Sequence, residues 1–346
     1  MLLALALVAT TARDIGSTVS ALRGIPVGED PTAVPLVARD FVASVKTELR
    51  DLAGSLLHDQ PGDAKIAAAH LQETMHTALK EAGAFEACVS EYGNYGTLDE
   101  PRVTASQPDL IAVEVSQQVP CGRDSALFLF RYQRDAWHLV FDRERAVNES
   151  IGDAADTLMF RVSPPDAHGS LLVLTADINP WCSSNWQMLR WRVDRINPGW
   201  REPEPVSRDE EAVFLDDDVK LDVTQDTYSL RFSGNSIDGA RVVRRYIRSY
   251  RIEAGNRLTR IEPIAETPQD FVEEWLLMTT PNDGIHLRGA FEQPVQCSAG
   301  VWQIALDPYG EGEDGEDPLY FLVAEEKGSY RMVARSDKPR EGCNRG

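Results

Sequence analysis

Residues 157–195 read TLMFRVSPPDAHGSLLVLTADINPWCSSNWQMLRWRVDR, and this stretch decides the fold. Leu171 to Leu174 is a continuous apolar run, which is typical of a strand buried on both faces. A second run, from Trp186 to Val193, alternates between apolar and polar residues, as in a half-buried strand. Asn179-Pro180 lies between the two runs and is a turn signal, because proline interrupts a central strand. The stretch therefore predicts a β-hairpin.

Short strand-like runs recur on both sides of this hairpin, from Leu110 to Ala334. Strand follows strand without crossover helices, which argues against a parallel α/β fold. Groups of three or four strands recur about every forty to fifty residues, a spacing typical of propeller blades. We therefore predict a mainly β fold, an antiparallel meander that forms a small propeller of about four or five blades. A β-sandwich is the alternative.

Two helices precede the strands. Apolar residues at helical spacing predict a helix over 35–58, with Phe41, Val45, Leu49, Leu52 and Leu56 on one face. Asp63 can cap a second helix that ends at Gly83, so 35–83 form a helical hairpin. Such a hairpin cannot bury its apolar faces alone and must pack on the rest of the chain or on a partner. The remainder, 84–346, is predicted as one all-β domain with a short helix at 268–278, started by Thr267-Pro268.

The first residues resemble the end of a secretory signal peptide. Leu2 to Val8 is apolar and small residues follow up to Ala12, but no Lys or Arg precedes the run, so we treat 1–12 as a truncated signal-like segment. Residues 13–34 contain Gly24, Pro26, Gly28 and Pro31 and are expected to be a linker. The apolar run is too short to span a bilayer. We expect an exported protein that does not span the membrane, in the periplasm or outside the cell.

Cysteine usage agrees with export. The five cysteines show neither a C-x-x-C pair nor zinc-ligand spacing. Two disulfides and one leftover thiol can form in an oxidising compartment. Cys297–Cys343 is the preferred pair, because Cys343 lies in a polar tail, while Cys88, Cys121 and Cys182 compete for the other bridge. Buried unpaired cysteines remain the alternative.

The charge balance excludes one class of partner. Lys and Arg number 35 against 55 Asp and Glu, giving a net charge of −20. Nucleic acid and anionic membranes would both repel such a protein, so neither is expected as a general partner.

The first candidate ligand site is the tip of the 157–195 hairpin. Tryptophan rings offer flat stacking surfaces, and carboxylate and amide groups offer hydrogen-bond partners, a combination that suits sugars. The candidate residues are Asp177, Asn179, Trp181, Asn185 and Trp186. The alternative interpretation places one or both tryptophans in the core and makes Asp177 and Asn179 turn formers. Turn chemistry alone then accounts for the Asp and the Asn.

The second candidate is a basic cluster, in which Arg244, Tyr246, Arg248 and Tyr250 share one face of a strand. Arg244 and Arg248 could bind a phosphate or an acidic glycan. The favoured alternative is a solvated face paired with nearby acids such as Asp222 and Asp226.

The spacing of possible metal-ligating residues in the sequence does not predict a metal site. The acidic run 311–317 has oxygen ligands for calcium, but it lacks helix–loop–helix spacing and is better explained as a solvated loop. Neither H-E-x-x-H nor G-x-S-x-G occurs, and no G-x-G-x-x-G joins a strand to a helix.

At Pro120-Cys121-Gly122 and at 177–182 the chain resembles exported, β-rich bacterial proteins without an assigned activity. The resemblance implies export and a β-rich fold and brings no catalytic residues. The leading hypothesis is therefore an exported, non-enzymatic binding protein for a glycan or a cell-envelope partner. A carbohydrate-active hydrolase with a carboxylate pair and a structural envelope component are the alternatives.

Overall fold

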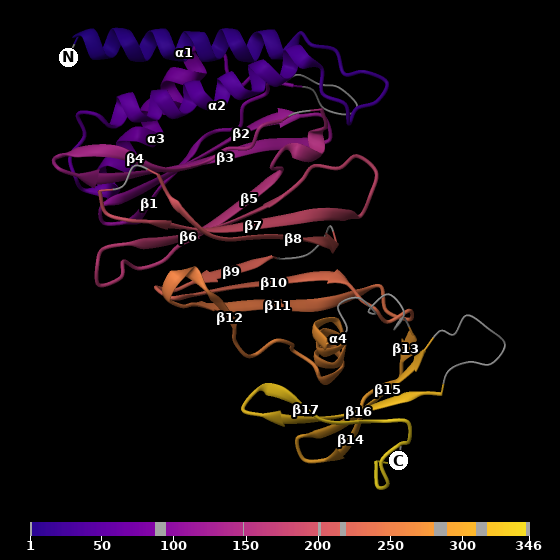
Figure 1. The fold of residues 1–346 in the computed structure, drawn as a ribbon. Helices are drawn as coiled ribbons and strands as arrows, with labels where there is room; N and C mark the ends of the chain where they lie inside the picture. Colours follow the sequence, from indigo (N-terminus) through magenta and orange to yellow (C-terminus); the bar gives the residue numbers. More distant parts are fainter. Residues whose placement is uncertain are drawn as a thin grey trace. The chain divides into compact units, whose positions relative to one another are not determined.

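The computed structural model describes residues 2–86, 95–147, 149–199, 202–214, 219–279, 289–308 and 317–343, with side chains from residue 9 onward. The chain divides into two compact units, Met1–Glu210 and Glu211–Gly346, which we describe one at a time. The described residues form four α-helices and seventeen β-strands, and every pairing between named strands is antiparallel (Figure 1). The predicted mainly β, antiparallel fold with N-terminal helices is confirmed.

Three helices begin the first unit: α1 (Leu2–Arg23), α2 (Leu36–Leu57) and α3 (Ala64–Glu81). Asp63 caps α3 as its sequence position suggested, because its carboxylate accepts hydrogen bonds from the backbone N–H groups of Lys65 and Ile66. The helices lie over one face of the sheet that follows (Figure 1). Their buried residues pack on Ile111, Val113 and Phe128.

The first unit then stacks two sheets. The first sheet has the order β1 (Arg102–Gln107), β2 (Leu110–Val119), β3 (Gly122–Gln133) and β4 (Ala136–Arg143). A 3₁₀ turn (Ile151–Asp153) leads into β5 (Thr157–Val162), β6 (Leu171–Ile178), β7 (Trp186–Ile196) and β8 (Glu204–Phe214), within which the boundary between the units falls. Alternate residues of β2 point to opposite faces, so Leu110 and Ala112 pack on Leu171 and Val173 while their neighbours face the helices.

This layering bears on two expectations. The propeller is not confirmed, because two sheets of the first unit pack face to face, as the sandwich alternative has it. The expected linker 13–34 also differs from the structure. Residues 13–23 are the second half of α1, where Ile15, Val19 and Leu22 are fully buried, and the glycines and prolines end the helix only after Arg23.

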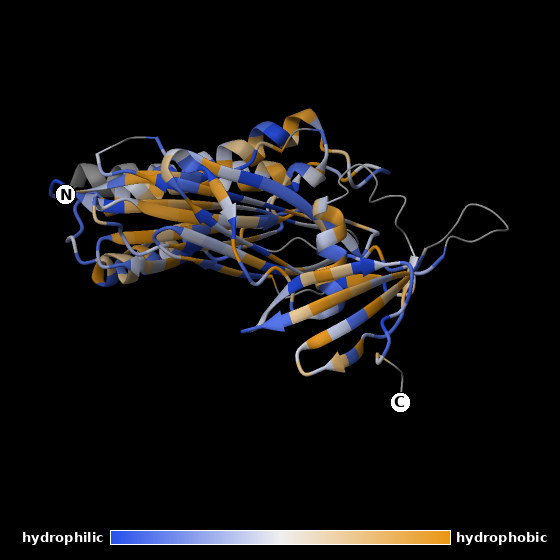
Figure 2. Ribbon diagram, turned by 60° about the horizontal axis from the view of Figure 1, so that its bottom comes forward, coloured by the Kyte–Doolittle hydropathy of each residue, from blue (hydrophilic) through white to orange (hydrophobic). Residues whose placement is uncertain are grey.

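The second unit continues with β9 (Lys220–Val223), β10 (Thr227–Asn235), β11 (Val243–Ile252), a 3₁₀ turn (Ala254–Asn256) and β12 (Leu258–Arg260). Helix α4 (Pro268–Thr279) follows, close to the 268–278 expected. The chain ends in a sheet of β13 (Gly289–Phe291), β14 (Val295–Ser298), β15 (Val301–Pro308), β16 (Leu319–Glu326) and β17 (Ser329–Ser336), whose strands are banded hydrophilic and hydrophobic in Figure 2. One face of α4 buries Phe271, Val272 and Leu276 against this sheet.

Two disulfides tie down the chain. Cys297–Cys343 confirms the preferred pairing, and Cys121–Cys182 is the second bridge, joining the β2–β3 turn to the β6–β7 connection. Cys88 lies outside the described residues. Two disulfides are consistent with an exported protein. In the part of the chain that the structure describes, no helix has the length and apolar character needed to cross a membrane.

Candidate anion-binding pocket

A pocket of about 810 Å³ in the first unit is lined by arginines. Arg143 and Arg145 come from the end of β4 and the segment after it, and Arg190 and Arg192 come from β7. Residues 205–210 of β8, the strand beside β7 in the sheet, also line the pocket and include Arg208, Asp209 and Glu210. A volume of this size is usual for a small-molecule site.

Strand geometry explains why these side chains meet. Arg190 and Arg192 are two residues apart on β7 and so point to the same face of the sheet. The β6–β7 register places Asp177 directly opposite Arg190. Arg143 ends β4 on the neighbouring sheet, and Arg145 follows two residues later.

Asp177 is the common counter-ion of three of these arginines. Its carboxylate is fully buried and lies 3.4 Å from Arg190 Nε, 3.5 Å from Arg143 Nη2 and 3.8 Å from Arg145 Nε. These separations exceed the roughly 2.7–2.9 Å of a strong charge-assisted hydrogen bond. One carboxylate is thus shared among three guanidiniums and does not pair tightly with any of them.

Backbone carbonyls hold two of the arginines in place. Arg190 donates from Nη1 to Gly152 O at 3.0 Å and from Nη2 to Ala154 O at 2.7 Å. Arg145 donates from Nε to Asp153 O at 2.7 Å. The 3₁₀ turn Ile151–Asp153 and the residue after it therefore set the positions of both guanidiniums.

The pocket concentrates positive charge. Arg192 pairs with the second buried carboxylate, Asp194, through a 2.7 Å hydrogen bond from Nε. Burial lowers the pKa of Arg143, and Arg145 and Arg192 lower it further, although Asp177 opposes them. Five arginines line the pocket, because Arg208 of β8 joins the four from β4, the segment after it and β7, and two carboxylates lie buried among them. The exposed acids of β8, Asp209 and Glu210, add charges that water screens.

The hairpin-tip residues divide between interior and surface. Asn179 is buried, and its amide oxygen accepts from Met188 N at 2.6 Å, which closes the turn in the way the turn-former alternative describes. Trp181 is 44% exposed and Asn185 is exposed, whereas Trp186 is half-buried. Asp177 alone of the five belongs to the arginine cluster; the ligand role of the other four stays a prediction.

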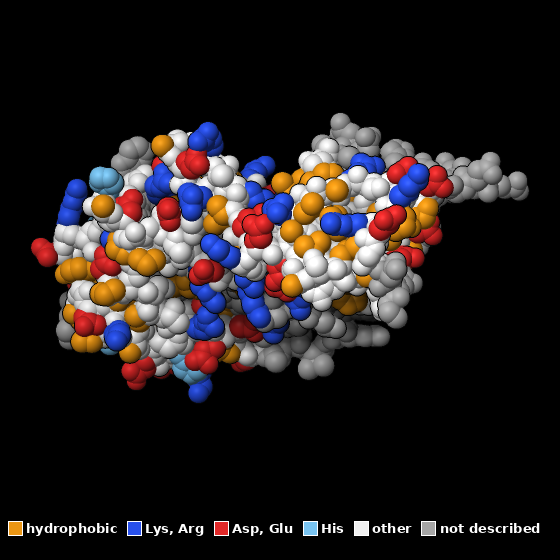
Figure 3. Space-filling model, turned by 90° about the horizontal axis from the view of Figure 1, so that it is seen from below, with side chains coloured by type: hydrophobic (Ala, Val, Ile, Leu, Met, Phe, Trp, Pro, Cys, Tyr) orange, Lys and Arg blue, Asp and Glu red, His pale blue; other side chains and the backbone are white. Residues whose placement is uncertain are grey.

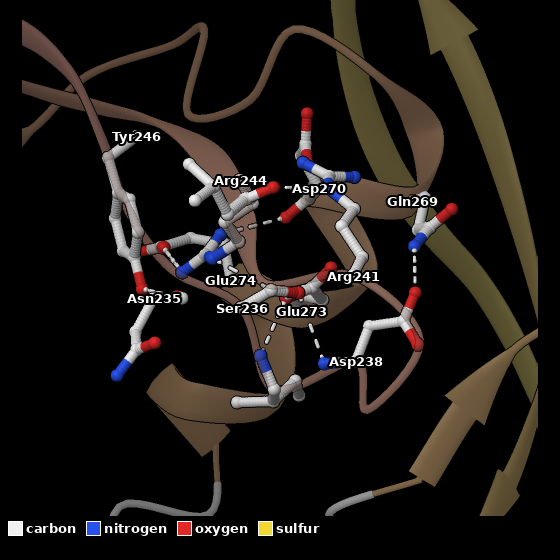
Figure 4. Close-up of polar contacts among 12 residues, drawn as sticks. Asn235, Ser236, Asp238, Arg241, Arg244, Tyr246, Gln269, Asp270, Glu273 and Glu274 are labelled. Atoms are coloured by element: carbon white, nitrogen blue, oxygen red, sulfur yellow. Dashed lines mark hydrogen bonds and ion pairs between the residues drawn. The ribbon is translucent and has the colours of Figure 1, made fainter. Parts of the chain in front are cut away.

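Arg244 and Arg248 lie in an ion-pair network inside the second unit, and Figure 4 shows Arg244 beside Glu273 and Glu274 of α4. Arg244 is buried and donates to Glu274 at 2.8 Å, and its guanidinium lies 3.7 Å from the centre of the Tyr246 ring. Arg248 also donates to Glu274, the acid of α4 that both share. Burial opposes ionisation of Glu274, but Arg248, Arg244 and Arg260 together hold its pKa below the usual value. These guanidiniums are occupied by protein carboxylates, so the cluster holds α4 and offers little to an external anion.

The acids that pair with these arginines differ from those expected. Asp222 and Asp226 lie near in sequence, but the partners are Glu273 and Glu274 of α4 and Glu211 of β8. Asp270 of α4 pairs with the neighbouring Arg241. The calcium prediction stays a prediction, because residues 311–316 lie outside the described residues.

Sequence reasoning missed the arginines of the pocket. The alternation of Arg190 and Arg192 with Trp191 was a visible signal for a shared face. Their meeting with Arg143 and Arg145 could not be read from the chain, because it depends on how two sheets stack.

Comparisons with known proteins add little. No family model and no curated protein matches the chain. Among solved structures, a protein from Parabacteroides distasonis ATCC 8503, whose naming as a glycoside hydrolase is provisional, is similar at 12% identity and a TM-score of 0.23. The match covers 74% of this chain and 72% of that one. A TM-score this low carries no argument about fold or activity.

Proposed function

We propose that the protein is an exported binding protein whose first unit takes an anionic ligand in the arginine-lined pocket, with short acidic saccharides of the cell envelope or the surroundings as the ligand class. The observation that supports this most is the gathering of five arginines around one pocket, against two buried carboxylates, Asp177 and Asp194, and two exposed acids of β8, Asp209 and Glu210. The periplasm or the exterior of the cell is the proposed location, which the two disulfides favour.

The residue type supports recognition of a carboxylate or a phosphate. The guanidinium group is planar and presents its donors in a fork that matches two oxygens of one anion. It is also always charged, so binding would not depend on a proton. In a chain of net charge −20, a local positive pocket is not explained by a need for solubility.

The donors of this pocket are only partly used within the protein. Arg190 spends both terminal nitrogens on backbone carbonyls. Arg145 donates from Nε to Asp153 O, and among the described residues its two terminal nitrogens have no hydrogen-bond acceptor. Arg143 touches Asp177 at 3.5 Å, an ion pair rather than a strong hydrogen bond. Arg143 and Arg145 are therefore the groups best placed to bind an anion.

Binding fits this geometry better than hydrolysis does. A glycosidase needs two carboxyl groups that reach the sugar, one of them carrying a proton. Asp177 and Asp194 are both fully buried, so neither carboxyl group is exposed to a sugar in the pocket. Burial raises the pKa of Asp194, although Arg192 opposes this. The pocket thus provides cationic contacts and no reachable acid–base pair from these two residues.

The proposal predicts that an acidic trisaccharide stabilises the folded chain and a neutral one does not. The measurement is the thermal unfolding midpoint in low-salt Tris chloride with trigalacturonic acid or maltotriose. A ligand that binds only the folded state adds about 2.7 kcal/mol of stability at a hundredfold excess over its dissociation constant. A rise with trigalacturonic acid alone, lost at 0.5 M NaCl, is expected, because salt screens the charges.

Citrate and inorganic phosphate serve as small-anion arms of the same experiment. A rise with citrate or phosphate but not with trigalacturonic acid would overturn the saccharide class and keep the anion site. Equal rises with maltotriose and trigalacturonic acid, or none with any anion, would contradict the anion site itself.

A further inference from the structure

A buried ion pair lies directly behind the arginine pocket. Lys46 of α2 and Asp124 of β3 are almost completely buried, and Lys46 Nζ lies 2.7 Å from Asp124 Oδ2. Both residues belong to the first unit. Burial raises the pKa of Asp124, although the adjacent Lys46 opposes this.

The two side chains also bind the backbone that carries the pocket. Lys46 Nζ donates to Arg145 O, and Asp124 Oδ1 accepts from Ala155 N at 3.4 Å. The neighbour of Asp124, Ser125, donates its backbone N–H to Ala155 O at 2.8 Å. The pair therefore fixes the chain at Arg145 and at Ala155, on both sides of the 3₁₀ turn.

The segment between these two points holds the pocket arginines. Arg190 donates to Gly152 O and Ala154 O, and Arg145 donates to Asp153 O. Lys46 thus bonds the backbone of Arg145 directly. Asp124 bonds Ala155 N, and the neighbouring carbonyl, Ala154 O, accepts from Arg190. At metal sites, mutation of a group that orients a ligating side chain from behind typically costs about 10- to 100-fold in affinity, and we expect the same kind of effect here.

A contribution to stability does not by itself explain why Lys46 and Asp124 form a buried ion pair. Removing two charges from water costs several kcal/mol for each ion, and replacing a buried pair with apolar side chains of similar volume is often neutral or stabilising. We infer that Lys46 and Asp124 are positioning residues, which hold the backbone at Arg145 and at Ala155 so that Arg145 and Arg190 face the pocket. The consequence for ligand binding rests on the proposed function; the consequence for the backbone does not.

The test is the double variant Lys46→Met/Asp124→Leu, which removes both charges together, so that neither is left without its counter-ion, and which also removes the bonds to Arg145 O and Ala155 N. We expect a thermal midpoint equal to or above that of the wild type, because no buried charge remains. Hydrogen–deuterium exchange should become faster in 144–155 while β2 keeps its protection. The affinity for trigalacturonic acid should fall by about tenfold or more, the lower end of what outer partners contribute at metal sites.

The control is Arg102→Met/Glu114→Leu, which removes an equally close pair, at 2.7 Å, on the surface of the same unit. It should leave the exchange of 144–155 and the affinity unchanged. Unchanged exchange of 144–155 in the Lys46→Met/Asp124→Leu variant, or faster exchange throughout the first unit, would overturn the positioning role. If exchange becomes faster in 144–155 alone but the wild type does not bind trigalacturonic acid, the positioning role is upheld and the proposed function is contradicted.

Discussion

The position of Asp177 in the hairpin could be predicted from the sequence, but its interaction partners could not. Its place in the β6–β7 hairpin was expected, with sugar hydroxyls or the local turn as its partners. In the structure it lies buried between Arg143, Arg145 and Arg190. The turn is closed by Asn179 instead. Turn chemistry is local and could be predicted, whereas the arginines reach Asp177 from two sheets.

Asp177→Asn should therefore lower the free energy of unfolding much more than the substitution of a turn residue would. The substitution leaves three guanidiniums facing one another without their shared counter-ion, and breaking a buried pair costs about 3–5 kcal/mol. Urea unfolding measures the free energy of unfolding directly. The control is Asp51→Asn, an exposed partner of Arg50 at 3.3 Å, which should cost about 1 kcal/mol or less. Equal losses in the two variants would show that Asp177 is only a turn residue.

At the scale of elements, helix starts were read well and long-range partners were not. Asp63 and Thr267 each lie at a helix start and bond the first turn, which depends on neighbours within three residues. Helix α1 was missed, because its apolar beginning looks like a signal segment and its burial depends on α2 and α3. Helix α4 was expected, but its acids Glu273 and Glu274 and their bonds to β11 were not.

Glu273 makes the stability contribution of α4 depend on pH. It is fully buried, and burial raises its pKa above the usual 4.5 although Arg244 opposes this. The folded state therefore binds the proton more tightly than the unfolded state. The resulting stability is present below pH 4.5 and is lost as the pH rises through the native pKa. Glu273→Gln removes this dependence.

We expect the free energy of unfolding of the wild type, relative to Glu273→Gln, to fall between pH 4 and pH 7. Urea titrations at pH 4, 5, 6 and 7 give the difference. Glu326→Gln, on the surface of β16, is the matched control and should follow the wild type within about 0.5 kcal/mol at each pH. A difference that stays constant or rises with pH would contradict the burial argument.

At the scale of the whole molecule, the amino-acid composition indicated which partners are unfavourable but not the chemistry of the pocket. Net charge alone suggested a protein that avoids anions. Positive side chains nevertheless gather at the pocket of the first unit. On the face that Figure 3 shows, basic and acidic side chains lie side by side. Fold class follows from strand periodicity, which is local. The packing of two sheets, the pocket it creates and the use of Arg244 and Arg248 inside the protein depend on contacts that periodicity does not contain.

The central claim is that Arg143 and Arg145 bind an anion in the first unit. Calorimetric titration of trigalacturonic acid into the wild type and into Arg143→Gln/Arg145→Gln tests it most directly. The control, Arg257→Gln/Arg331→Gln, removes the same charge from exposed positions of the second unit. We predict binding to the wild type and the control, and at least about a hundredfold weaker binding after the loss of two charge-assisted contacts. Equal binding by all three proteins, or no binding by the wild type, would contradict the claim.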